Sequence, residues 1–110
     1  SFVPDEKYGI SFFTLALLFD GRGDSHYQFE HSIKKEGGYK LEIKVINTKC
    51  STGFDIEING LKQTTYHPDA EGVYKHWFSS PLKSGRNTFK IIPHDKGCLI
   101  LDYMDVSRSP

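Results

Sequence analysis

The side chains that could do chemistry here are histidines, carboxylates, cysteines and aromatic rings. The chain has five histidines, and no two follow the HxH or HxxxH spacing that places two imidazoles on one face. His31 beside Glu30 and His94 beside Asp95 are weak pairs. A metal-binding or catalytic set would have to be assembled by the fold. The simpler interpretation is histidines on exposed strands and turns.

No motif in the chain predicts a catalytic nucleophile or a phosphate site. A GxSxG elbow is absent, and neither cysteine has the flanking residues of a catalytic thiol. The glycines of Gly21–Ser25 lie between two strand-like runs, whereas a phosphate loop leads from a strand into a helix. Carboxylates such as Asp102 and Asp105 carry no mark of a general acid and base. We therefore expect no enzymatic activity.

Cys50 and Cys98 are the two cysteines, and neither has the CxxC or CxxH spacing of a zinc site. Two interpretations stay open. As a disulfide they would close a long loop and stabilise the fold by about 4 kcal/mol in the chain-entropy model. As free thiols they would be small apolar side chains.

Aromatic rings near turns are the strongest chemical feature. Tyr74 and the single tryptophan, Trp77, are three residues apart, so strand alternation predicts opposite faces for them. Tyr27 follows the turn-like GRGDSH. A sugar site needs a ring that stacks on the apolar face of a pyranose, beside groups that bind its hydroxyls. The alternative is that these rings fill the core.

The segment GRGDS, Gly21 to Ser25, has two interpretations. From its residue types it is a turn, because glycine adopts positive φ and the side chains of Asp and Ser form hydrogen bonds with their own backbone. As a motif it resembles the integrin-recognition sequence of adhesive proteins. We predict a turn that delivers Tyr27 to one end of the domain, with adhesion as the alternative.

The elements that position these residues are strands. Tyr39, Leu41, Ile43 and Val45 alternate with Lys40, Glu42 and Lys44 in water, and Phe54, Ile56 and Ile58 repeat the pattern. Asn59-Gly60 is a strong hairpin signal. Ile10–Phe19 is predicted as a buried strand, and SRSP at the end as the start of a linker. The fold class predicted is an all-β antiparallel sandwich of about seven or eight strands.

Length and charge limit the organisation and the partners. The 110 residues fit one domain, 1–110. The formal net charge is zero, which argues against nucleic acid and anionic membranes as partners. The apolar run Ile10–Phe19 is too short to span a membrane. Because the chain begins at Ser1, we expect a piece processed or excised from a larger protein.

The second half of the chain resembles carbohydrate-binding modules of the family 6 and family 35 type. The resemblance rests on GGYKLEIKVIN, DIEING, EGVYKHWFSSPLKSGRNTFKI and CLILDYMDV, in this order from about Gly37 to Val106. It implies a jelly-roll sandwich that binds a polysaccharide without catalysis, in a secreted protein and attached to a catalytic or other domain. A protein-interaction or adhesion domain, or an accessory domain that completes a glycan-active enzyme, is the alternative.

The resemblance also implies site residues. By position they are Tyr74 or Trp77 as the stacking ring, Tyr27 from the loop after Gly23, and Asp95 or Lys96 before the last strand. Asp95 departs from the family, where this loop often carries Asn. Asp102 matches the closing-strand ligand of a structural calcium. The N-terminal third departs more, because it offers only Asp5 and Glu6 where the family has paired glutamates.

Overall fold

The computed structural model describes residues 7–23 and 25–109, with side chains from Leu15 onward, and these residues form eight strands. None of the described residues belongs to a helix that could cross a membrane. The strands are β1 Lys7–Phe19, β2 Tyr27–Ile33, β3 Gly37–Asn47, β4 Phe54–Ile58, β5 Leu61–Tyr66, β6 Gly72–Leu82, β7 Gly85–Pro93 and β8 Gly97–Arg108.

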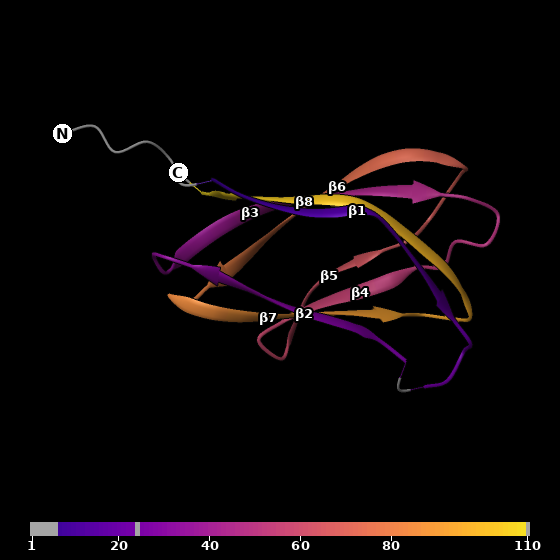
Figure 1. The fold of residues 1–110 in the computed structure, drawn as a ribbon, viewed down its shortest axis with the longest axis horizontal. Helices are drawn as coiled ribbons and strands as arrows, with labels where there is room; N and C mark the ends of the chain where they lie inside the picture. Colours follow the sequence, from indigo (N-terminus) through magenta and orange to yellow (C-terminus); the bar gives the residue numbers. More distant parts are fainter. Residues whose placement is uncertain (1–6, 24, 110) are drawn as a thin grey trace.

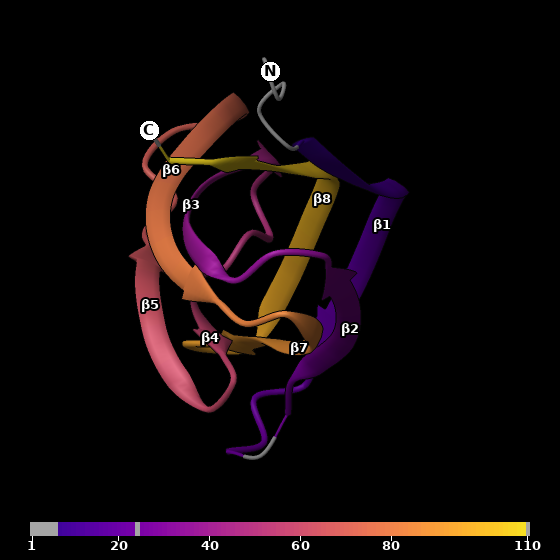
Figure 2. The ribbon, with the colours of Figure 1, turned by 90° about the vertical axis from the view of Figure 1, so that its left-hand side faces the viewer.

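Two four-stranded sheets pack face to face (Figure 1). Sheet A has the order β1-β8-β3-β6, and sheet B has the order β2-β7-β4-β5. Neighbouring strands in both sheets are antiparallel. Figure 2 shows β1 and β2 along one side of the sandwich and β5 and β6 along the other. The predicted all-β antiparallel sandwich is confirmed.

The core lies between the sheets and is built from the inward residues of each alternating strand. Leu41 and Ile43 from sheet A are completely buried, as are Phe54, Ile56 and Phe89 from sheet B. The rings of Phe29 and Phe89 stack with centroids 5.0 Å apart. Burying one such side chain contributes roughly 1.5–3 kcal/mol. The alternation predicted for 38–47 and 54–58 is therefore confirmed on the core side.

The Asn59-Gly60 hairpin also forms as predicted. Asn59 has φ 53° and Gly60 has φ 87°, so both central residues are left-handed, as a type I′ turn requires. The turn joins β4 to β5, which pair from Ile58 and Leu61 onward.

The prediction of a buried strand over Ile10–Phe19 is wrong for its described side chains. Leu15 and Leu17 are only partly buried, Ala16 is exposed, and Leu18 is 87% exposed. The reason is that β1 is an edge strand of sheet A and has no layer over its outer side. The side chains of residues 10–14 lie outside the described residues. A long apolar run thus occurs on a strand with one open face.

The predicted linker start is also wrong for residues 107–109. Ser107 and Arg108 belong to β8, and Ser109 N donates to the carbonyl of Gly38 at 3.0 Å. Lys7 at the start of β1 is the register partner of Ser107. Both described chain ends therefore lie at the same end of the sandwich (Figure 1).

Candidate functional site

Four segments cross between the two sheets at the end opposite the chain termini, and we call this the loop end. They are residues 20–26, 94–96, 48–53 and 67–71, in the order in which the strands place them across the sandwich. At the other end, only 34–36 and 83–84 cross between the sheets, because 59–60 is a turn within sheet B. The loop end therefore carries most of the irregular backbone, where binding residues commonly lie.

Backbone hydrogen bonds hold the middle loops together. His94 N donates to Gly53 O at 2.8 Å, and Asp95 N donates to Thr52 Oγ1 at 3.2 Å. A Cβ on Gly53 would lie 2.7 Å from His94 Nδ1, so only glycine permits this approach. The loops of the loop end are consequently held against each other, which fixes the positions of their side chains.

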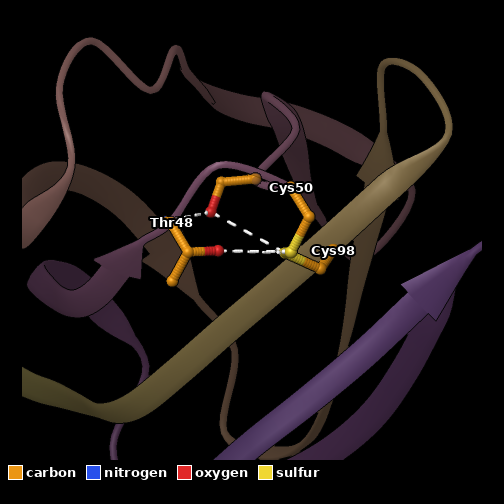
Figure 3. Close-up of a disulfide and its surroundings, with 4 residues drawn as sticks. Thr48, Cys50 and Cys98 are labelled. Atoms are coloured by element: carbon orange, nitrogen blue, oxygen red, sulfur yellow. Dashed lines mark hydrogen bonds between the residues drawn. A yellow bond between two sulfur atoms is a disulfide. The ribbon is translucent and has the colours of Figure 1, made fainter.

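A disulfide adds a covalent tie between the 48–53 segment and the start of β8. Cys50 and Cys98 are bonded, with Cα atoms 5.2 Å apart and a sequence separation of 48. Figure 3 shows the Thr48 hydroxyl directed at the sulfurs, 3.2 Å from Cys50 Sγ. Cys98 N also donates to Cys50 O at 2.8 Å. Of the two interpretations of the cysteines, the disulfide is the correct one.

Tyr74 stands at one corner of the loop end. It is 37% exposed, its ring contacts Gly72, and its hydroxyl donates to Glu71 O at 3.4 Å. Tyr27 lies at the opposite corner, because β2 and β5 are the two edges of sheet B and β6 lies beside β5. Three strand spacings separate these corners, or roughly 14 Å. One sugar ring cannot stack on both tyrosines.

The other loop residues predicted as ligands lie between these corners. Asp95 and Lys96 are exposed, and the Asp95 carboxylate accepts a hydrogen bond from Lys96 N at 2.7 Å. Lys96 Cβ packs against Gly21 in the neighbouring loop. Tyr27 is partly buried, with its ring 5.8 Å from that of Phe29 at the margin of the core. Less of the Tyr27 ring than of the Tyr74 ring is therefore exposed for stacking.

The GRGDS segment forms a turn stabilised by Asp20. Its carboxylate accepts hydrogen bonds from Arg22 N at 3.0 Å and Ser25 Oγ at 3.2 Å. The Arg22 side chain is 80% exposed and pairs with Asp20 at 3.2 Å. Asp24 lies outside the described residues. The turn precedes Tyr27 as predicted, and Arg22 does not pack on the sandwich.

A histidine–aspartate pair joins the 94–96 loop to β4, and sequence reasoning missed it. His94 Nε2 lies 2.8 Å from Asp55 Oδ1, which also accepts the Thr65 hydroxyl at 2.7 Å. Burial alone raises the pKa of Asp55, but the hydrogen bonds and the charge of His94 outweigh it, so this pKa is lowered. His94 and Asp55 are 39 positions apart in sequence, so no local motif could predict the pair. The imidazole nitrogens face Asp55 and Gly53.

The predicted stacking residue Trp77 lies elsewhere, in the middle of β6 on the outer side of sheet A. Its side chain is 53% exposed, and its register partner on β3 is Glu42. The ammonium of Lys40 lies over the indole, 4.4 Å from the ring centroid. Because Tyr74 and Trp77 point to opposite sides of β6, as alternation predicts, they belong to different surfaces.

We call the outward side chains around Trp77 the Trp77 face. Glu42, predicted to point into water, is only 8% exposed and accepts the Tyr103 hydroxyl at 3.2 Å. Burial and the carboxylates of Glu42 and Asp105 raise the pKa of Tyr103, which keeps this hydroxyl protonated. The face comprises Trp77 and Lys75 of β6, Lys40, Glu42 and Lys44 of β3, and Tyr103, Asp102 and Asp105 of β8.

Asp102, the predicted calcium ligand, is paired with a cation. Its carboxylate lies 3.2 Å from Lys44 Nζ. In the described part of the chain, no three histidine, cysteine or acidic side chains come together to hold a metal ion. Asp5 and Glu6 lie outside the described residues. In the described residues the carboxylate of Asp102 is paired with the ammonium of Lys44, which a calcium ion at this position would have to displace.

Solved carbohydrate-binding modules share this fold. A family 35 module from an environmental isolate aligns with TM-score 0.69 at 17% identity, over 87% of this chain and 74% of that chain. A module of Cellvibrio mixtus lichenase 5A, solved with cellotriose, aligns with TM-score 0.64 at 15% identity, over 94% of this chain and 98% of that chain. The GH26-CBM35 β-(1,4)-mannanase of Podospora anserina aligns with TM-score 0.68 at 15% identity, over 96% of this chain and 28% of that chain.

At these identities the likeness shows the fold. No protein-family model and no curated protein matches the chain. The fold is therefore the jelly-roll sandwich that the resemblance to family 6 and family 35 modules implied. The predicted ligand residues divide between the loop end (Tyr27, Tyr74, Asp95 and Lys96) and the Trp77 face.

Proposed function

We propose that this domain binds carbohydrate without catalysis, as an extracellular module attached to a catalytic or other domain. The solved neighbours support the proposal, since one was solved with cellotriose and another is part of a mannanase chain. The observation that carries it is Trp77, an indole 53% exposed midway along the edge strand β6, on the outer side of sheet A. An exposed tryptophan beside polar groups is the arrangement that sugar stacking needs.

The Trp77 face supplies both parts of a sugar site. The indole offers an apolar surface for one pyranose, and Glu42 and Tyr103 beside it form a part-buried hydrogen-bonded pair 3.2 Å apart. Tyr103 fixes the orientation of the Glu42 carboxylate, which lies opposite Trp77 in the strand ladder. Because Glu42 is only 8% exposed, we expect the exposed ammonium groups of Lys40 and Lys75 to bind sugar hydroxyls while the ring stacks.

The loop end is the second surface for the same function. Tyr74 would stack there, with Asp95 and Lys96 as polar contacts and Tyr27 at the far corner. Tyr74 is less exposed than Trp77 and uses its hydroxyl within its own loop. We therefore place the principal site at Trp77.

Paired ring deletions test the function and separate the two surfaces. A glycan array followed by titration calorimetry on its best ligand should show binding for the unchanged domain. We expect Trp77→Ala to weaken this binding at least about tenfold, since truncating a buried aromatic anchor commonly costs this much or more. We expect Tyr74→Ala to change it about twofold or less.

Thermal unfolding is the control for both variants. Each ring is partly exposed, so the free energy of unfolding should fall by only about 1 kcal/mol. A reversed order, with Tyr74→Ala abolishing binding and Trp77→Ala tolerated, would move the site to the loop end. A blank array for a folded domain would contradict carbohydrate binding and favour a protein partner, for which Arg22 in the exposed turn is the first residue to test.

A further inference from the structure

The Trp77 ring carries a cation in the unliganded protein. Lys40 Nζ lies 4.4 Å from the indole centroid, well within the range over which a tryptophan face attracts an ammonium. Strand register explains the contact. Glu42 is the partner of Trp77 and Ser79 the partner of Lys40, so Lys40 and Trp77 are diagonal neighbours across β3 and β6. A ligand that stacks on this face of the ring must displace the ammonium.

The accessible charge beside the ring is positive. Lys75 is exposed next to Trp77 on the outer side of β6, and Lys40 is exposed across the ladder. The nearest carboxylate, Glu42, is 8% exposed and holds the Tyr103 hydroxyl. Asp102 is neutralised by Lys44 at 3.2 Å. The exposed carboxylate of Asp105, the register partner of Glu42 on β8, lies one strand further from Trp77 than Glu42 does. An anionic group bound beside Trp77 would therefore meet the ammonium groups of Lys40 and Lys75 before it met this carboxylate.

We propose that Lys40 determines the specificity of the Trp77 face and makes it prefer acidic glycans over neutral glycans of the same backbone. The proposal rests on the function proposed above. A neutral sugar displaces Lys40 from the ring and offers the ammonium only uncharged oxygen acceptors. A sugar with a carboxylate or sulfate ester accepts charge-assisted hydrogen bonds from the displaced ammonium while its ring stacks on Trp77.

Matched polysaccharide pairs test this preference. We would titrate polygalacturonate against its methyl ester, and dextran sulfate against dextran, by affinity electrophoresis at low salt. The two pairs separate carboxylate from sulfate as the preferred anion. The unchanged domain should bind the acidic member of at least one pair about fivefold or more tightly, as one desolvated charge contact predicts. Added salt should shrink this difference.

Two lysine variants of equal charge make the comparison specific. Lys40→Gln should reduce the preference to about twofold or less, because the ring no longer carries a cation. Lys62→Gln removes the same charge from exposed β5 on the other sheet and should leave the preference unchanged. Trp77→Ala should weaken binding to both members of the pair. Thermal unfolding would confirm that all three variants fold.

Tryptophan fluorescence tests the local charge without any glycan. Trp77 is the single tryptophan of the chain, so its emission reports on this face alone. Iodide should quench it more strongly, relative to neutral acrylamide, in the unchanged domain than in Lys40→Gln. Equal iodide quenching in the two proteins would overturn the role of Lys40.

The outcomes separate the two proposals. If Trp77→Ala abolishes glycan binding but Lys40→Gln keeps the same preference, or if neutral glycans bind better throughout, carbohydrate binding stands and the role of Lys40 is wrong. If glycan binding depends on Tyr74 and not on Trp77, carbohydrate binding likewise stands and the role of Lys40 is wrong. If no polysaccharide binds while iodide quenching depends on Lys40, carbohydrate binding itself fails.

Discussion

The carboxylate of Asp55 joins three segments at the loop end. It accepts hydrogen bonds from His94 and Thr65, at 2.8 and 2.7 Å, and so links β4 to β5 and to the segment after β7. Its pKa is lowered from the ordinary value of 3.8. A carboxylate whose pKa is lower in the folded protein stabilises the fold above the unfolded pKa and loses this contribution as pH falls through the folded pKa.

Replacing Asp55 should therefore cost stability at neutral pH and little in acid. We expect Asp55→Asn to lower the free energy of unfolding by about 1–2 kcal/mol at pH near 7, the usual cost of losing charged hydrogen bonds. The cost should shrink as the pH falls from 3.8 through the lower pKa of the folded protein, and it should be small in strongly acidic solution, where the carboxyl is protonated in both states. Urea unfolding at both pH values measures it.

Glu57→Gln on the same strand is the matched control. It removes an outward carboxylate for which the structure shows no histidine partner among the described residues, and it should change stability by less than about 0.5 kcal/mol at either pH. A cost for Asp55→Asn that is the same at both pH values would contradict the role given to the charge.

At the scale of elements, the 48–53 segment is fixed by one covalent bond and several backbone contacts. The disulfide joins this segment to β8, and Gly97 is pressed against it, since a Cβ there would lie 2.5 Å from Cys50 O. The Thr52 hydroxyl oxygen of the same segment accepts a hydrogen bond from Asp95 N at 3.2 Å. Its anchoring therefore also fixes the neighbouring 94–96 loop.

Removing the disulfide should destabilise the domain without changing its sheets. The bond spans 48 residues, for which chain entropy predicts about 4 kcal/mol, while measured native disulfides give about 2–5 kcal/mol. We expect a loss in that range for the double variant Cys50→Ser/Cys98→Ser, measured by urea unfolding. Reduction of the unchanged domain should give the same loss, and no change on reduction would contradict the bond.

Strands were predictable from sequence where alternation, turn chemistry and burial agree. Leu41, Ile43 and Val45 face the core as their spacing predicts, and Asn59-Gly60 turns the chain as this dipeptide usually does. The prediction of a buried strand for the apolar run ending at Phe19 was wrong, because a pattern of apolar residues does not reveal whether a strand lies at a sheet edge. Leu18 is exposed for that reason.

The candidate site was less predictable, because it depends on strand order. Tyr74 and Trp77 were singled out as rings, and their opposite faces followed from spacing. The partners of Trp77 could not be found in this way. Lys40, Glu42 and Tyr103 reach it only because β3 lies between β6 and β8. The pairs His94–Asp55 and Cys50–Cys98 join residues far apart in sequence for the same reason.

At the scale of the whole molecule, stability comes from the core between the two sheets and from the disulfide and hydrogen bonds of the loop end. Calcium has no evident place among the described side chains, since Lys44 already neutralises Asp102 at 3.2 Å. We expect the melting temperature in calcium chloride and in EDTA to agree within about 1 °C, because an ion that does not bind the folded state cannot stabilise it.

A rise of several degrees with calcium would contradict this expectation. Asp102→Asn then locates the ion, since the rise should disappear in that variant if Asp102 is a ligand. A rise that survives in Asp102→Asn but is lost in Asp5→Asn/Glu6→Gln would place calcium at the N-terminal acids instead.

The pairing of Lys7 with Ser107 has a consequence for how such a domain can be used. The chain enters and leaves on adjacent strands, about 5 Å apart. A host protein could therefore open one of its own surface loops and carry this sandwich as a cassette, with little disturbance to its own backbone. The loop end would then point away from the host, and the sheet carrying Trp77 would lie along its flank.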